Sequence, residues 1–388
     1  MHNRMRRWED LPDGLLDSFI ARLSSFHDLL AFEATCRSWR AAFLSYPPKH
    51  TLGTLFPPLL MQPDDPSCSR CPPQPFRKIL VPTRICRITD IANKDTDQCC
   101  EIPRFCIHRR KNAPRCPLDR FCFRGASYGT LILSSNKSCV LFDVFTGATV
   151  SCPQMPVFED TELSYGALTA PLTSPNSHLF VDTGLQNLFW CVGSHSWVGC
   201  TPADGPIKQI VVFKGRVFGM DSNCRIFRVH LTPRISIHEL PVLESRLINK
   251  WHLSDPWLVV CGDMLLLIGL PGRSHLVTNG VTFEVFRLDL STEPAVWLKV
   301  EKLENWAIFI STDKRSQTLS CMDPEIWGGA SNSVYCYNQD SQHWIALELG
   351  KPVQGHGSKF NPDIFVSMGR ESKLRPMWIF PSMFSLRQ

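Results

Sequence analysis

Ser127 is the residue whose setting most resembles that of a catalytic nucleophile. It lies in Gly125-Ala126-Ser127-Tyr128-Gly129, which has the spacing of a serine raised at a sharp turn between a strand and a helix. The residues that follow, 130–133, are apolar or β-branched and predict a strand. The pattern therefore disfavours acyl-transfer chemistry at Ser127, and we expect the two glycines to permit a turn.

A second group with possible chemistry is a run of cysteines. Cys68-x-x-Cys71 has the spacing with which two thiolates reach one zinc ion. No second Cys-x-x-Cys or His pair completes the site, so we expect reduced thiols and no bound metal. The basic run 108–111 would suit a nuclear signal or a phosphate contact, although a solvated loop is the simpler interpretation. The cysteines of this zone are Cys68, Cys71, Cys86, Cys99, Cys100, Cys106, Cys116 and Cys122.

No other cofactor or catalytic motif is present in the sequence. It holds no phosphate-binding Walker loop, no dinucleotide fingerprint and no His-Glu-x-x-His. We therefore expect no catalytic residue and no cofactor.

Composition is typical of a globular, non-membrane chain. Of 388 residues, 44% are hydrophobic and 20% charged, which suggests two or three domains with sizeable cores. The net charge of +5 is too small to indicate nucleic acid or a membrane as a partner. The N-terminal residues are charged and lack an apolar stretch, and the 17 cysteines suit a reducing compartment. We therefore expect a soluble protein of the nucleus and cytoplasm.

Helical periodicity is confined to residues 8–45. A first helix is predicted behind Pro12, because Leu15, Leu16, Phe19, Ile20 and Leu23 recur at helical spacing. Leu15, Leu16 and Ile20 are expected to share one stripe. Asp28 is expected to cap a second helix that runs on to residue 45. The apolar stripe of this second helix is Leu29, Phe32, Cys36, Trp39 and Phe43.

Residues 121–386 change to a period of two and predict an all-β domain. Residues 46–120, rich in proline and cysteine, are predicted as a connecting region with some strand content, which contributes first strands to the β domain. Turns are expected at Lys214-Gly215, at 221–223 and at 261–263, each between two apolar strands. The apolar segment 376–384 is expected to be a strand or anchor that closes the domain against residues 50–130.

The β domain also carries an irregular repeat. Aromatic residues recur at steps of 47, 38, 59 and 49 residues, which is typical of four-stranded propeller blades. These steps predict a β-propeller, although a large β-sandwich remains open as an alternative. The residues are Phe142, Phe189, Phe227, Phe286 and Tyr335.

The helical segment resembles the F-box, the adaptor-binding module of Skp–cullin–F-box ubiquitin ligases. The likeness rests on Leu-Pro at 11–12, Asp-Leu-Leu at 28–30 and Cys-Arg-Ser-Trp-Arg at 36–40. It implies a three-helix F-box that binds a Skp-type adaptor and, through it, a cullin scaffold. A module this small can hardly bury its apolar surface alone, so a partner surface is expected. The implied adaptor-binding residues are Leu11, Pro12, Leu15, Leu16, Ile20, Leu23, Leu29, Leu30, Phe32, Cys36 and Trp39.

The β domain resembles the KIB-type β-propeller of plant F-box proteins. The likeness rests on Gly125, Ser127 and Gly129, on Asp-x-Phe-Thr-Gly at 143–147, and on Trp378, Pro381 and Ser382. It implies a kelch-like propeller of about six or seven blades.

Together these features predict a non-catalytic substrate receptor of a ubiquitin ligase. The F-box would hold the adaptor and the propeller would hold a target protein for ubiquitylation. Two alternatives remain: a β-propeller enzyme or small-ligand sensor with a helical appendage, and an adaptor binder that recruits no substrate. An enzyme would need titratable groups that converge in a central cavity.

Overall fold

The strand and turn pattern between residues 209 and 230 forms three consecutive antiparallel strands, as predicted. Lys214 and Gly215 both have positive φ, which is the backbone of a tight two-residue hairpin turn. Asp221 closes the next turn, because its carboxylate accepts hydrogen bonds from the backbone N–H groups of Asn223 and Arg225.

The fold is known from a computed structural model of the chain. It describes residues 8–23, 25–46, 53–63, 84–92, 97–102, 122–135, 137–158, 161, 163–201, 205–243, 253–271, 282–311, 313–338, 343–351 and 374–381.

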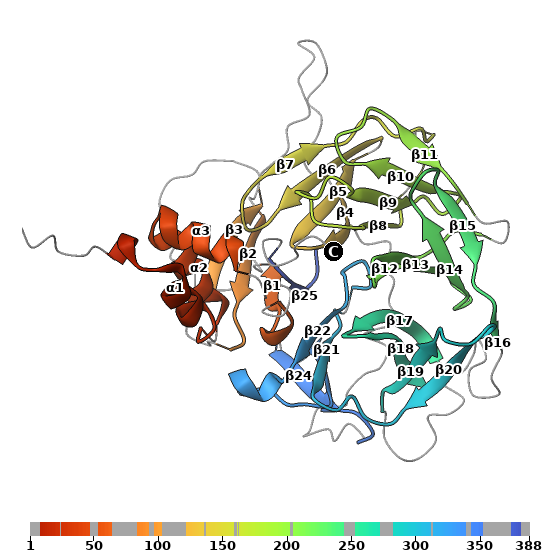
Figure 1. The fold of residues 1–388 in the computed structure, drawn as a ribbon. Helices are drawn as coiled ribbons and strands as arrows, with labels where there is room; N and C mark the ends of the chain where they lie inside the picture. The colour runs from red at the N-terminus through yellow and green to blue at the C-terminus, as the bar shows by residue number, and fades with distance from the viewer. Residues whose placement is uncertain are drawn as a thin grey trace, which may run out of the picture.

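Six antiparallel or mixed sheets are arranged as blades around a central axis (Figure 1). The ring confirms the predicted propeller and excludes the sandwich. The first blade has the order β25-β1-β2-β3, from β25 (Met377–Ile379), β1 (Leu59–Pro63), β2 (Arg84–Thr89) and β3 (Asp97–Ile102). The second contains β4 (Cys122–Ser127), β5 (Thr130–Ser135), β6 (Ser138–Asp143) and β7 (Thr149–Ser151). The third contains β8 (Tyr165–Leu168), β9 (His178–Asp182), β10 (Asn187–Cys191) and β11 (Trp197–Gly199).

The other three blades complete the ring. The fourth contains β12 (Gln209–Phe213), β13 (Arg216–Met220), β14 (Ile226–His230) and β15 (Ser236–Glu239). The fifth contains β17 (Leu253–Cys261), β18 (Met264–Pro271), β19 (Glu284–Asp289) and β20 (Ala295–Val300), with β16 (Val242–Leu243) parallel at its edge. The sixth has the order β22-β21-β23-β24, from β21 (Trp306–Phe309), β22 (Leu319–Met322), β23 (Ser333–Asn338) and β24 (His343–Glu348), with a short helix η3 (Pro324–Trp327) between β22 and β23.

The repeated aromatic residues occupy equivalent positions in successive blades. Each lies in the third strand outward from the axis, in β6, β10, β14, β19 and β23, and each side chain is buried. The unequal spacing in sequence comes from connections of different length between strands of equivalent position.

The C-terminal segment closes the ring, as predicted. β25 pairs with β1, so that Leu60 is opposite Trp378 and the last described strand completes the first blade. The backbone N–H of Trp378 also donates a hydrogen bond to the hydroxyl of Ser311 at 3.0 Å. Pairing the two ends of the chain in one sheet removes an exposed strand edge from the ring.

The helical segment contains three helices beside the first blade (Figure 1): α1 (Asp13–Ile20), α2 (Phe26–Thr35) and α3 (Arg37–Ser45), preceded by a short helix η1 (Trp8–Asp10). The prediction of one long second helix is wrong, because Cys36 is extended, with φ −161° and ψ 176°, and separates α2 from α3. The predicted cap is also wrong. Ser25 caps α2, with its hydroxyl accepting from the backbone N–H of Asp28 at 3.1 Å. Among the helices of the described residues, none has the length and apolar character needed to cross a membrane.

Candidate protein-binding surfaces

The helix α1 divides its apolar residues between two faces. Leu16 and Ile20, four residues apart, are fully buried and point inward. Leu15 and Phe19, also four residues apart, are 51% and 40% exposed. The prediction that Leu15 shares a stripe with Leu16 and Ile20 is therefore wrong, because one residue along a helix turns the side chain by about 100°.

The exposed face of α1 continues onto α3 through aromatic rings. Phe19 stacks on Trp39 with centroids 6.3 Å apart and planes inclined by 16°, and Trp39 also contacts Phe32 at 4.6 Å. The Trp39 indole N–H donates to the carbonyl oxygen of Trp8 at 3.0 Å, which attaches η1 to α3. We call Leu15, Phe19 and Trp39 the outer apolar face. Phe19 is among the residues that recur at helical spacing, but it is not among the adaptor-binding residues that the F-box resemblance implies.

The remaining predicted residues of the module are mostly inside it. Leu29 and Phe32 are buried, Leu11 and Leu23 are partly buried against the same core, and Leu30 is half-buried. Pro12 is exposed. Cys36 is half-buried, and the Ser38 hydroxyl 3.1 Å from its Sγ holds the pKa of the thiol below its ordinary value.

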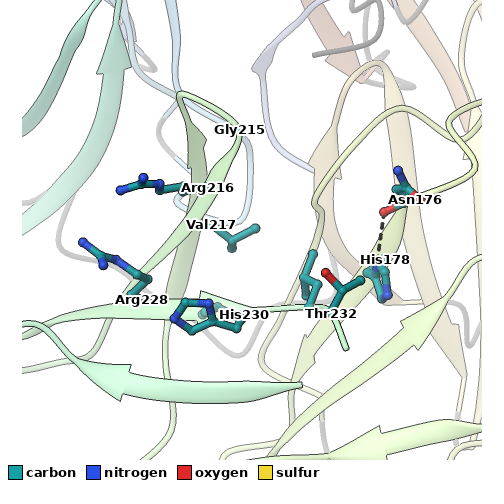
Figure 2. Close-up of a pocket in the computed structure, with 10 residues that line it drawn as sticks. Asn176, His178, Gly215, Arg216, Val217, Arg228, His230 and Thr232 are labelled. Carbon is teal, nitrogen blue, oxygen red and sulfur yellow. Dashed lines mark hydrogen bonds between the residues drawn. The ribbon is translucent and has the colours of Figure 1, made fainter. Parts of the chain in front are cut away.

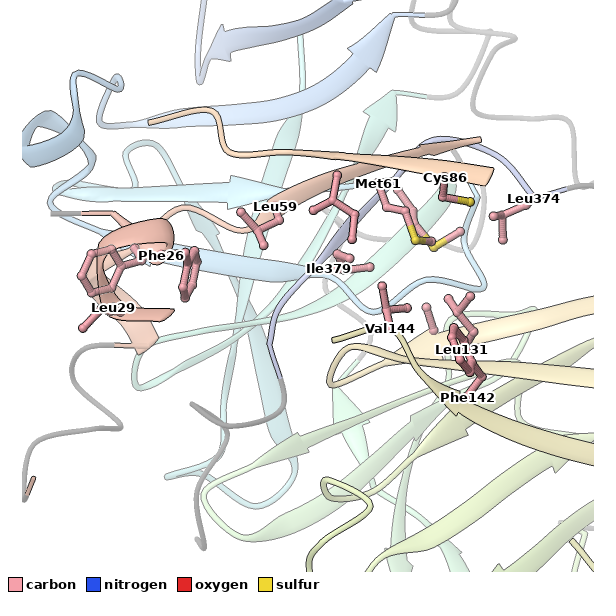
Figure 3. Close-up of a cluster of buried hydrophobic side chains, with 14 of the residues drawn as sticks. Phe26, Leu29, Leu59, Met61, Cys86, Leu131, Phe142, Val144, Leu374 and Ile379 are labelled. Atoms are coloured by element: carbon pink, nitrogen blue, oxygen red, sulfur yellow. The ribbon is translucent and has the colours of Figure 1, made fainter. Parts of the chain in front are cut away.

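The inner face of the module packs on the propeller. Phe26 of α2 contacts the rings of Phe56 and Phe380, with centroids 5.3 and 5.1 Å away. Figure 3 shows Phe26 and Leu29 at one end of a continuous row of buried side chains that reaches the second blade. The propeller therefore covers the inner apolar face of the module, and the outer apolar face remains exposed.

The centre of the ring is occupied by the connection between β21 and β22 (Figure 1). It reaches the innermost strands of three other blades. In the second blade, Ala126 exchanges backbone hydrogen bonds with Arg315 and Gln317, at 3.0 and 2.9 Å. The connection also contacts the fifth blade, where Thr318 donates to the Leu258 carbonyl at 3.1 Å, and the first blade through Ser311.

The charged groups of this connection are paired with one another or with neighbouring blades. Arg315 binds Asp313 at 2.6 Å, and its guanidinium also donates to the Phe123 carbonyl at 2.7 Å. Lys314 lies 2.6 Å from the carboxylate of Asp255, and its ammonium is 4.5 Å from the Trp257 ring centroid. Burial lowers the pKa of Lys314 to about 8 despite the neighbouring Asp255.

The geometry around Ser127 is that of a structural residue. Thr130–Ser135 is the strand β5, so no helix follows the serine. The Ser127 hydroxyl is buried and accepts a hydrogen bond from the backbone N–H of Leu168 at 3.2 Å. Only Gly129 lies in the turn, with φ of 71°; Gly125 lies within β4, where a Cβ would be 1.9 Å from the carbonyl oxygen of Gly166. The expectation that both glycines permit a turn is therefore wrong for Gly125. This glycine instead permits the close approach of the second and third blades.

The cysteine zone is only partly within the described residues. Cys68, Cys71, Cys106 and Cys116 lie outside them, as does the basic run 108–111. Among the residues that are described, no group of three or more His, Cys, Asp or Glu side chains could hold a metal ion. The expectation that Cys68-x-x-Cys71 binds no metal thus stays a prediction.

Comparison with known proteins agrees with this architecture. The sequence model of the KIB1-4 β-propeller family matches residues 100–360, about two thirds of the chain. The Arabidopsis thaliana protein At3g25750, which carries an F-box name, is 23% identical over 348 residues, covering 84% of this chain and 86% of that protein. The F-box protein At2g26160 of Arabidopsis thaliana is 19% identical over 357 residues, covering 88% and 98%.

Similarity to solved structures is weak. The N-terminal domain of Nup159 has a TM-score of 0.31 and 8% identity, with 56% of each chain covered. At these values the likeness carries no functional inference.

Proposed function

The chain belongs to the KIB1-4 β-propeller family, and on that premise we propose that it is the substrate-recognition subunit of a Skp–cullin–F-box ubiquitin ligase. Relatives named as F-box proteins and the propeller fold support a substrate-receptor-like role. The finer assignment adds a Skp-type adaptor, a cullin scaffold and a target protein. We further propose that the protein acts in the nucleus and cytoplasm and that neither nucleic acid nor a membrane is its partner.

The outer apolar face is the observation that carries the proposal. The propeller covers the inner face of the helical module, yet Leu15 and Phe19 remain exposed beside Trp39. Apolar side chains gathered at one surface mark a protein contact more often than isolated ones do. We assign this face to the adaptor, together with Leu11 and Pro12 as the F-box resemblance implies, and we assign the buried residues of the module to positioning it.

The proposed mechanism requires no catalytic residue in this chain. The module binds the ligase through the adaptor while the propeller holds the target. A target lysine is then kept close to the charged conjugating enzyme, and its effective concentration accelerates ubiquitin transfer. The pairing of the described charged groups at the centre of the ring supports this role over a β-propeller enzyme, because Arg315 is bound to Asp313 and Lys314 to Asp255.

Calorimetry of the full chain with a purified Skp-type adaptor tests the first half of the proposal. Leu15→Asp should weaken binding at least about tenfold, because a charge would enter an apolar contact without a partner. Its melting temperature should stay unchanged, since the side chain is exposed. Leu16→Asp is unsuitable for this purpose, because Leu16 lies in the core shared with the propeller. The matched control is Leu185→Asp, which changes an exposed leucine between β9 and β10. Unchanged adaptor affinity in Leu15→Asp would overturn the adaptor assignment.

Proximity labelling under proteasome inhibition tests the second half. With the wild-type chain, labelled proteins should accumulate in ubiquitylated form, and with Leu15→Asp they should be labelled without ubiquitin. If the adaptor binds but no labelled protein accumulates, the chain is an adaptor binder that recruits no substrate.

A further inference from the structure

The stretch of chain that contains the third blade has neither lysine nor arginine. Between Lys137 and Lys208 neither residue type occurs, although together they account for 41 of the 388 residues of the whole chain. The formal charge of this stretch is therefore negative, in a chain whose net charge is +5. Because charge of one sign attracts partners of the other, this part of the protein favours a basic ligand. The acidic residues of the stretch are Asp143, Glu159, Asp160, Glu162, Asp182 and Asp204.

Three connections between strands meet at one end of the third blade. The register places Tyr165, at the start of β8, and Asn187, at the start of β10, opposite Asp182, at the end of β9. Cys200, which directly follows β11, donates its backbone N–H to the Asn187 carbonyl at 2.9 Å. The β7–β8 connection, the β9–β10 turn and the β11–β12 connection therefore all lie at this end.

The buried carboxylate of Asp182 holds these connections together. It accepts a hydrogen bond from the hydroxyl of Ser164, at the end of the β7–β8 connection. It also accepts one from the backbone N–H of Gly184 in the β9–β10 turn, at 2.8 Å. The ammonium of Lys208, at the end of the β11–β12 connection, is 2.8 Å away and balances the charge of the carboxylate. Because all three connections are fixed to one side chain, this end of the blade is a pre-organised surface.

Two large apolar side chains are exposed on these connections. No large apolar side chain of the described residues is more exposed than Phe158 of the β7–β8 connection, at 81%, and Leu185 of the β9–β10 turn is 75% exposed. Val157 and Leu163, on either side of Phe158, are buried in a core cluster with residues of β9 and β10. This anchoring holds Phe158 at the end of the blade without covering it. We call Phe158 and Leu185, with the Asp182 that fixes their connections, the third-blade platform.

The charge that accompanies Phe158 in the sequence is of one sign. Glu159 and Asp160 follow Phe158 directly, and Glu162 comes two residues later. The connection from residue 152 to residue 164 contains no basic residue. The apolar side chain of Phe158 is therefore accompanied by negative charge alone.

Arginines of the fourth blade are paired or lie away from the platform. Arg225 is bound to Asp221 at 2.7 Å. Arg216 and Arg228 border a hollow of about 470 Å³ that also includes His178, the first residue of β9. The hollow is thus at the end of the third blade opposite to the platform, and Figure 2 shows both arginine side chains extending away from His178. These cations therefore do not oppose a basic ligand at the platform.

The helical module is anchored at the other end of the blades. The inner strands β4 and β8 lie side by side, with the Ser127 hydroxyl bonded to the Leu168 N–H at the end remote from the platform. Gly129 follows at that end, where a Cβ would be 2.8 Å from the carbonyl oxygen of Phe380. Phe380 in turn contacts Phe26 of the module. A ligand on the platform therefore leaves this attachment of the module undisturbed.

We propose that the third-blade platform binds a basic segment of the target protein, in which apolar side chains accompany lysine or arginine. The inference rests on the proposed substrate-receptor function and specifies the chemistry of its target. Phe158 and Leu185 supply the apolar contact, and their fixed connections lower the entropic cost of binding. The acidic sequence around Phe158 attracts the basic side chains and disfavours acidic segments.

Fluorescence anisotropy of the full chain with labelled peptide pools tests the proposal. In the basic pool, Lys or Arg alternates with Leu, Ile or Phe, and in the neutral pool Gln replaces Lys and Arg. The wild-type chain should bind the basic pool at least about tenfold more tightly than the neutral pool. Raising the salt from about 50 mM to about 500 mM should remove most of this difference, because the charges are screened at the surface.

Substitutions at the platform separate a local contact from general attraction. Phe158→Ala should weaken binding of the basic pool about tenfold, and Leu185→Ala should weaken it several-fold, because each removes an apolar contact. Both side chains are exposed, so melting should not change. The matched control is Ile326→Ala, which shortens a side chain that is 61% exposed on η3 of the sixth blade and should bind as the wild type does.

Three results would overturn the proposal. The first is equal affinity for the basic and neutral pools. The second is an equal loss in Phe158→Ala and Ile326→Ala, which would mean that the peptides bind to no particular apolar residue. The third is tighter binding of a pool with Glu in place of Lys and Arg. Adaptor binding by calorimetry is measured in parallel, and its persistence would show that the proposed adaptor function stands although the platform fails.

Discussion

The ring of Phe26 in α2 meets the ring of Phe380 edge to face, with centroids 5.1 Å apart and planes inclined by 80°. Phe380 directly follows β25, the strand that closes the propeller. One side-chain contact therefore joins the first folded module of the chain to its last described strand. We infer that the helical module and the closed ring stabilise each other.

Substitutions at this contact should show energetic coupling. Phe26→Ala should lower the free energy of unfolding by about 3 to 5 kcal/mol, because the ring is fully buried. In a double-mutant cycle with Phe380→Ala, we expect a coupling free energy of about 1 kcal/mol from the ring pair. Urea unfolding of the four proteins measures it. Additive effects would mean that the module and the closing segment are energetically independent.

Trp378 should be the most sensitive residue of the closing strand. Its side chain is 1% exposed and contacts Phe309 of the sixth blade with ring centroids 5.1 Å apart. Trp378→Ala should therefore cost about 3 to 5 kcal/mol. Trp378→Phe should cost much less, because the indole N–H has no hydrogen-bond acceptor among the described residues.

Truncation after Leu374 removes the closing strand altogether. It exposes the edge of β1, so size-exclusion chromatography should show aggregation. A monomeric truncated chain with unchanged melting would contradict the closing role of β25.

Lys314 should make the stability of the propeller depend on pH between about 8 and 10.5. Its pKa is lowered from 10.5 to about 8 in the folded chain, chiefly by burial. Between these two values the unfolded chain holds the proton that the folded chain has lost, so the contribution of this group to stability rises with pH. Wild type should therefore gain on the order of 3 kcal/mol relative to Lys314→Met over this range.

Denaturant unfolding of wild type and Lys314→Met at several pH values measures the difference between their free energies of unfolding. The titration of other groups affects both proteins equally and cancels in this difference. A difference that stays constant from pH 7.5 to 10 would mean that the folded chain does not shift the pKa of Lys314.

Substitution of Gly125 should destabilise the protein more than substitution of Ser127, as expected if both residues have structural roles. A Cβ at Gly125 meets the Gly166 carbonyl, so Gly125→Ala should force the second and third blades apart and cost about 3 kcal/mol. Ser127→Ala loses one hydrogen bond, to the Leu168 N–H, and should cost about 1 kcal/mol. Thermal melting compares the two. A larger loss in Ser127→Ala, or loss of target ubiquitylation with unchanged stability, would return a functional role to Ser127.

Local patterns in the sequence were sufficient to predict the hairpins that repeat in the fold. Strand pairs such as β12 and β13 are neighbours in sequence, so their alternation and the turn at Lys214-Gly215 predict the hairpin. The tail around Trp378 was predictable as a closing element, because so many apolar residues rarely occur in a free terminus. The length of the second helix was not predictable in this way, since Leu29, Phe32, Cys36 and Trp39 keep helical spacing across the break at Cys36.

By itself the sequence determined the combination of N-terminal helices with a β-propeller, the likeness of residues 8–45 to an F-box and the blade-like repeat, because these depend on residues close together in the chain. Only the tertiary structure decided which face of α1 stays exposed. Leu15 and Leu16 are equally apolar neighbours, and Leu16 is buried because it shares a core with residues such as Met377 and Ile379, which are remote in sequence. The same holds for the contacts that the β21–β22 connection makes with other blades at the centre of the ring. Lys314 of the β21–β22 connection meets Asp255 of the neighbouring fifth blade, and this relationship leaves no signal in local spacing.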